Sequence, residues 1–100
     1  MATPTAVQLA ALQRLWEVAN KNSGQCKYVA AFLLGLYNGR RFPFDLTDFR
    51  LLDDDIMKDC LLVIEMDSSP QKEVHDHLGC NNGEFEQLAR DWSIPDRSPR

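Results

Sequence analysis

The sequence predicts an all-α fold, a single compact domain of about five helices packed around a central apolar helix. Apolar residues recur at spacings of three and four along much of the chain, as they do on one face of a helix. The segment 28–37 is apolar nearly all round, which is typical of a helix that packs against others on several sides. One hundred residues with 44% hydrophobic content supply one core and are too few for two domains.

The first helix is expected from Thr5 to about Asn20. Thr5 and the preceding Pro4 suit its start, and the run Asn-Ser-Gly at 22–24 suits the break after it. Its apolar residues lie on one helical face: Leu9, Leu12, Leu15, Trp16 and Ala19.

The second, central helix is expected from Gly24 or Gln25 to Tyr37. Ser23 is a candidate cap for its start. Asn38 and Gly39 predict a left-handed stop at its end, because these residue types tolerate positive φ.

The segment 40–52 predicts an ordered connection with one helical turn from Leu46 to Arg50. Pro43 pushes the residue before it out of helical geometry and so disfavours a continuous helix. The connection carries too many apolar side chains to leave together in water: Phe42, Phe44, Leu46, Phe49, Leu51 and Leu52. We therefore expect it to join the core or an interface.

The third helix is expected from an Asp53 cap to about Met66. Asp54 and Asp55 then fall in its first turn, where the helix dipole favours negative charge. Its predicted buried stripe is Ile56, Met57, Cys60, Leu61, Val63 and Ile64.

Two short helices complete the predicted domain. Ser69-Pro70 predicts the start of a fourth helix, which reaches Leu78 and is closed by Gly79. Asn82 is the expected cap of a fifth helix that ends at Trp92. We expect residues 1–92 to form the helical domain and residues 93–100 a flexible C-terminal tail.

Charge is distributed unevenly along the chain. The segment 45–67 contains eight carboxylates and two cations, a local net charge of −6 against −4 for the whole chain. Residues 1–44 contain five basic residues and only Glu17 as an acid. A dense acidic surface attracts cationic partners and repels nucleic acid, so we expect no direct nucleic-acid binding.

Metal and catalytic sites are poorly supported by the pattern. His75 and His77 lie two residues apart, so on a helix they point about 200° from each other. Cys80 is the next candidate ligand, with Cys26 or Cys60 as a further one. Gly79 is expected to end the helix between His77 and Cys80, so no zinc site is expected. The carboxylates at 53–55 also diverge by about 100° each, which disfavours a magnesium cluster.

No catalytic residue and no cofactor are predicted. An enzyme that uses Cys80 as nucleophile with His77 as base stays open as a third hypothesis, but no oxyanion-hole signal or orienting carboxylate accompanies the pair. We expect a non-enzymatic protein.

The helix pair at 74–92 carries an alternative function. Val74, Gly79, Phe85 and Leu88 fall where a helix-turn-helix places apolar residues and a turn glycine. The second helix would present Glu84 and Glu86 to the phosphates, with Arg90 as its only cation. The alternative is therefore a small DNA-binding or adaptor regulator that uses this pair.

The chain shows no membrane-spanning run, since the most apolar stretch is half of the roughly 20 residues required. Its N-terminus lacks the features of a secretory signal, and its three cysteines follow no disulfide or metal spacing. We expect a cytoplasmic protein with reduced thiols and no membrane association.

The blocks 37–53 and 59–67, together with Glu73, His75 and Leu78-Gly79, resemble a family of small proteins carried by bacterial conjugative elements, plasmids and phages. The resemblance covers about Ala19 to Trp92 and brings no assigned activity. It implies a setting in which small acidic proteins often act as counter-defence inhibitors, such as anti-CRISPR proteins.

The functional prediction combines this setting with the acidic segment. We expect an inhibitor that binds a host protein complex at the surface where that complex handles nucleic acid. The predicted partner-binding residues are Asp48, Asp54, Asp55, Asp59 and Glu65, with Arg40 and Arg41 as a second patch. The aromatic residues between Phe42 and Phe49 leave both a monomer and a homodimer open.

Overall fold

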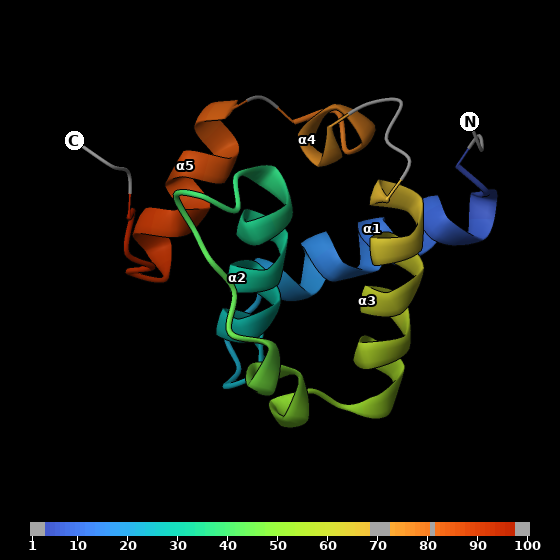
Figure 1. Ribbon diagram of the computed structural model, residues 1–100, viewed down its shortest axis with the longest axis horizontal. Coiled ribbons are helices and arrows are strands. Elements are labelled where there is room, and N and C mark those ends of the chain that lie inside the picture. The colour runs from blue at the N-terminus through green and yellow to red at the C-terminus, as the bar shows by residue number, and fades with distance from the viewer. Residues whose placement is uncertain (1–3, 69–72, 81, 98–100) are drawn as a thin grey trace.

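A computed structural model describes residues 4–68, 73–80 and 82–97, and this part of the chain is helical without strands. Its helices follow the predicted order: α1 (Ala6–Ala19), α2 (Cys26–Tyr37), the 3₁₀ helix η1 (Leu46–Leu51), α3 (Asp54–Asp67), α4 (Val74–His77) and α5 (Asn82–Asp91). The prediction of an all-α single domain is confirmed. In Figure 1, α2 stands between α5 and α3, and α1 crosses behind α3 and α2.

Helix α1 begins with a capping box. The Thr5 hydroxyl oxygen accepts from the Gln8 backbone N at 3.1 Å, and the Gln8 side-chain oxygen accepts from the Thr5 backbone N at 3.0 Å. This reciprocal pair satisfies two donors that a helix start leaves open, so α1 begins where the sequence predicts. Leu12 and Leu15 of its predicted apolar face are buried, whereas Leu9 of that face is 39% exposed.

Helix α2 is central, as predicted, and contacts α1, α4, α5 and η1. The expected start and end signals are wrong, however. Gln25 occupies the N-cap position instead of Ser23, and no side chain caps this end. Asn38 leaves the helix in extended geometry with φ −158°, and Gly79 is the one described glycine with positive φ.

The extended exit from α2 lets the following loop fold back onto the helix at Gly35. A Cβ atom at Gly35 would lie 3.3 Å from both the Phe42 carbonyl oxygen and the Phe44 Cβ. Phe42 is buried, and Phe44 packs on Phe49 with ring centroids 4.9 Å apart. The aromatic part of the connection therefore joins the core as expected, whereas Leu46 at its edge is 72% exposed.

Helix α3 packs against α1 through Cys60, Val63 and Met66. The predicted buried stripe is wrong for Leu61 and Ile64, which are 53% and 38% exposed. The helix covers its core through a narrower stripe than its apolar residues suggest, because no described helix packs on the Leu61 side.

Asp53 occupies the N-cap position of α3 but makes no side-chain cap hydrogen bond. Its carboxylate instead accepts from the Gln25 side-chain nitrogen at 2.9 Å, and its backbone N donates to the Gln25 side-chain oxygen at 3.0 Å. The expected cap is thus replaced by a link between the starts of α2 and α3.

The predicted start of the fourth helix, Ser69-Pro70, lies outside the described residues. The single-turn α4 ends before Gly79, as predicted, and Gly79 has a left-handed φ of 70°. Helix α5 buries Phe85, which stacks on Trp16 of α1 with ring centroids 5.0 Å apart. No helix in the described ranges is long and apolar enough to cross a membrane.

The described part of the expected tail, residues 93–97, lies against the domain. Ile94 packs on the core, and the Arg97 backbone N donates to the Arg41 carbonyl oxygen at 2.7 Å. Flexibility of the tail as a whole stays a prediction.

Candidate functional site

Five acidic side chains lie along η1 and at the start of α3, and we call them the acidic end: Asp45, Asp48, Asp53, Asp54 and Asp55. It lies at the bottom of Figure 1, where the chain turns from η1 into α3. Asp54 and Asp55 are exposed in the first turn of α3, and Asp48 is half-buried in the first turn of η1. Three of the predicted partner-binding residues, Asp48, Asp54 and Asp55, therefore belong to the acidic end.

Neutral donors orient two carboxylates of the acidic end, and exposed cations lie beside it, since Lys27 and Arg97 line a hollow together with Asp45 and Asp48. The Thr47 hydroxyl and backbone N donate to Asp45 at 2.7 and 2.9 Å, which lowers the pKa of that carboxyl group. Asp53 is held in the same way by the amide of Gln25. A carboxylate that is fixed and still charged can attract a cationic surface with little loss of side-chain entropy.

Asp59 has a different environment from the acidic end. Arg14 of α1 donates to both of its carboxylate oxygens, at 2.8 and 2.9 Å, and this pairing raises the pKa of the guanidinium group. The Asp59 side chain is only 14% exposed. The predicted binding residue therefore lies in an ion pair that joins α3 to α1.

Glu65 also faces α1. Its carboxylate accepts from the Gln8 side-chain nitrogen at 2.8 Å, and the residue remains exposed. It lies more than two turns along α3 from Asp55, so it is not part of the acidic end.

Arg41 is the centre of a charged network that joins the α2–η1 loop to α5 and the C-terminal segment. Its guanidinium donates to both Glu86 oxygens at 2.7 Å and to Asp96 at 2.8 and 3.2 Å. The Tyr37 hydroxyl also donates to Glu86, at 2.7 Å. Arg41 has a structural position, whereas the neighbouring Arg40 is exposed.

This network lowers the pKa of Glu86, chiefly because Arg41 donates to it, and raises the pKa of Arg41. Burial and the Glu86 carboxylate raise the pKa of Tyr37. Glu86 and Asp96 are 45 and 55 residues from Arg41 in sequence. Local sequence patterns contain no signal for such a pairing, and sequence reasoning missed it.

An apolar groove of about 210 Å³ lies between α2, η1 and α3. Its walls are almost free of polar atoms and include Phe32, Leu36, Phe44, Leu46, Phe49 and Ile64. Leu46 and Ile64 stand at its edge with much of their surface in solvent. The groove therefore offers an apolar site next to the acidic end, on the same two helices.

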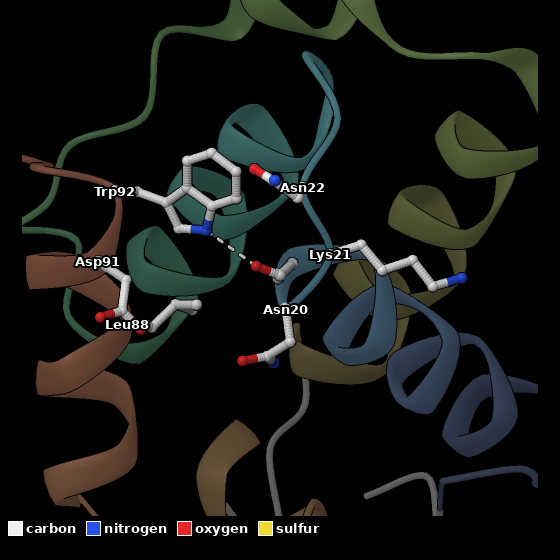
Figure 2. Close-up of a pocket in the computed structure, with 7 residues that line it drawn as sticks. Asn20, Lys21, Asn22, Leu88, Asp91 and Trp92 are labelled. Carbon is white, nitrogen blue, oxygen red and sulfur yellow. Dashed lines mark hydrogen bonds between the residues drawn. The ribbon is translucent and has the colours of Figure 1, made fainter.

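A second hollow, of about 240 Å³, lies where the ends of α1 and α5 meet (Figure 2). The Trp92 indole nitrogen donates to the Ala19 carbonyl oxygen at 2.8 Å across it. Asn20, Asn22 and Asp91 give it a polar lining. The hydrogen bond fastens α5 to α1, which gives Trp92 a structural role.

The thiols of Cys60 and Cys80 lack the properties of a catalytic nucleophile. Burial raises the pKa of Cys60 to about 12, and burial together with Glu84 raises that of Cys80 to about 12. Both thiols are therefore protonated near neutral pH, where the nucleophilic form is the thiolate. Among the described residues, no group of three or more His, Cys, Asp and Glu side chains could hold a metal ion.

The alternative DNA-reading pair corresponds to α4 and α5. Helix α4 is a single turn, and α5 carries Glu84, Glu86 and Asp91 against Arg90. Glu86 is neutralised by Arg41, and the Arg90 guanidinium donates to Gln87 at 2.9 Å.

Comparisons with known proteins give one family. A search of curated proteins and of solved structures finds no match. A family model described as a family of unknown function, DUF7673, matches residues 9–93, which is most of the chain. The chain belongs to the DUF7673 family.

Proposed function

We propose that this protein works by binding another protein through the acidic end, and that its partner presents a cationic surface. The carrying observation is the run of Asp45, Asp48, Asp53, Asp54 and Asp55 along η1 and the start of α3, where neutral donors orient two of them. Fixed carboxylates complement lysine and arginine side chains and speed association with them. The same charges repel nucleic acid.

In its most concrete form, the proposal is that the protein inhibits a host complex that handles nucleic acid, and a CRISPR complex is the first candidate. Carboxylates at the acidic end would compete with phosphates for the lysines and arginines that line a nucleic-acid groove. The resemblance to proteins of mobile elements supports this choice of partner. The raised pKa values of Cys60 and Cys80 support a non-enzymatic role.

The proposal is tested by affinity capture of the tagged protein from a host lysate, with and without nuclease treatment. A defence complex that stays bound after nuclease treatment is the expected result. Retention that is lost on nuclease treatment would overturn the proposal and favour the DNA-binding or adaptor alternative at 74–92.

Two triple variants locate the binding surface. The acidic reversal variant carries Asp48→Lys, Asp54→Lys and Asp55→Lys. The control variant changes the net charge equally at exposed residues of α1, α4 and α5, through Glu17→Lys, Asp76→Lys and Asp91→Lys. Far-UV circular dichroism checks helicity in both, because lysine near the start of α3 opposes the helix dipole.

A further inference from the structure

Part of the exposed apolar surface of η1 and α3 adjoins the apolar groove, and Leu61 lines a separate hollow with Lys58, Leu62 and Glu65. Ile64 lines the groove, and Leu61 lies three residues earlier on α3, hence on a neighbouring part of the same helix face. Leu46 forms the edge on η1. We call Leu46, Leu61, Ile64 and the groove the apolar docking surface.

This surface has the pattern of a helix-binding face. Met57, Leu61 and Ile64 follow the spacing of four and three residues by which one helix presents a seam to another. A dry cavity of about 150 Å³ accommodates benzene. The groove of about 210 Å³ therefore has room for one leucine or phenylalanine side chain.

The charges around this surface are mainly negative. Asp45 and Asp48 flank Leu46 on η1, Asp54 lies two turns before Leu61 on α3, and Lys58 and Glu65 line one hollow with Leu61. Asp67 lies one turn beyond Ile64, and burial together with Glu73 raises its pKa, so a cation beside it would be stabilising. Exposed cations also lie on these elements: Arg40 after α2, Arg50 on η1 and Lys58 on α3.

These observations favour one kind of occupant. A second copy of the chain would bring the same excess of carboxylates to the interface, and like charges oppose association. A cationic helix avoids this repulsion and buries its own apolar face.

We propose that the apolar docking surface binds a cationic amphipathic helix of a partner protein, with one apolar side chain of that helix seated in the groove. This inference rests on the proposed function and specifies the chemistry of the partner. Lysine or arginine side chains of the helix face Asp54 and Asp67, and its apolar side chains cover Leu61 and Ile64.

The test uses three fluorescein-labelled helical peptides of equal length, measured by fluorescence anisotropy against the full chain. The first has leucine on one face and lysine on the other, the second replaces lysine by glutamate, and the third replaces leucine by alanine. The leucine–lysine peptide should bind at least about tenfold more tightly than either control peptide. Equal binding of the alanine–lysine peptide would overturn the inference.

Point variants then locate the site. Leu46→Asp and Leu61→Asp should each weaken binding of the leucine–lysine peptide, whereas Val7→Asp should leave it unchanged. All three side chains are more than half exposed, so the fold tolerates the changes. Because each aspartate adds negative charge, weaker binding of a cationic peptide cannot come from weaker electrostatic attraction. An equal loss in Val7→Asp would contradict the assignment of the site.

The same variants separate this inference from the proposed function. If the acidic reversal variant loses the captured partner while Leu46→Asp and Leu61→Asp retain it, the inference fails and the proposed function stands. If none of these variants loses the partner, the inference and the proposed function both fail.

Discussion

Replacing Arg41 by alanine should destabilise the fold and release α5 and the C-terminal segment from the α2–η1 loop. The substitution removes two hydrogen bonds to Glu86 and two to Asp96. It also removes the guanidinium group that lies 4.9 Å from the centre of the Phe42 ring. The Glu86 carboxylate would keep the Tyr37 hydroxyl as a donor but lose its counterion.

The size of the effect follows from the exposure of the pair. The side chains of Arg41 and Glu86 are 26% and 28% exposed, and Asp96 is 43% exposed. An exposed ion pair contributes at most about 1 kcal/mol, whereas loss of one partner of a buried pair costs about 3–5 kcal/mol. An intermediate loss of about 2 kcal/mol corresponds to a fall in Tm of about 8–16 °C for a domain of this size.

The effect also has a defined pH dependence. Arg41 holds the pKa of Glu86 below its ordinary value near 4.5. The stabilisation is therefore fully present above pH 4.5 and is lost as the pH falls through the lower, folded-state pKa. The stability difference between the wild type and Arg41→Ala should shrink below about pH 4.

Thermal unfolding followed by far-UV circular dichroism at pH 7 and at pH 3 measures both effects. Arg40→Ala is the matched control, because Arg40 is the exposed neighbour of Arg41, and its Tm should stay near that of the wild type. Arg41→Lys keeps the charge but not the paired hydrogen bonds, so its Tm should lie between those of the wild type and Arg41→Ala. Equal Tm values for Arg41→Ala and Arg40→Ala at pH 7 would refute the structural role of Arg41.

Three further predictions concern the core, the α4–α5 turn and the thiols. Phe85→Ala should lower the free energy of unfolding by about 3–5 kcal/mol in urea titration, because Phe85 is fully buried against Trp16; an unchanged midpoint would contradict this packing. Gly79→Ala should cost about 1 kcal/mol in the same assay, since its φ is 70°, and a stabilising effect would be incompatible with that turn. Cys60 and Cys80 should react with iodoacetamide at pH 8 far more slowly than the unfolded chain does, as judged by site-resolved mass spectrometry; equal rates would show that their pKa is not raised.

Local patterns in the sequence determine most of the elements. The start of α1 at Thr5, the periodic apolar residues of α1 and the closure of α4 by Gly79 each depend on a few neighbouring residues, so the sequence predicts them. The end of α2 was predicted wrongly because the approach of Phe42 and Phe44 to Gly35, which is a tertiary contact, decides it.

The buried face of α3 shows a second limit of prediction from the sequence. Leu61 and Ile64 fit helical periodicity as well as Val63 does, yet they face solvent and the groove edge. Periodicity identifies the apolar side of a helix, but the neighbouring helices decide how much of that side is covered.

The exposed carboxylates of the candidate site were predictable from the sequence, whereas the ion pairs were not. Asp54 and Asp55 are exposed, as expected of charged residues in the first turn of a helix. The pairing of Asp59 with Arg14 and of Arg41 with Glu86 joins residues 45 positions apart, and charge counting cannot reveal such pairs.

The central claim is that the acidic end binds a cationic surface of a partner protein. The most direct measurement is the affinity of the purified, captured partner for the wild type, the acidic reversal variant and the control variant at two salt concentrations. The claim predicts that the reversal variant loses binding, that the control variant keeps it, and that wild-type binding weakens as salt rises. Equal affinities for the reversal and control variants, independent of salt, would contradict it.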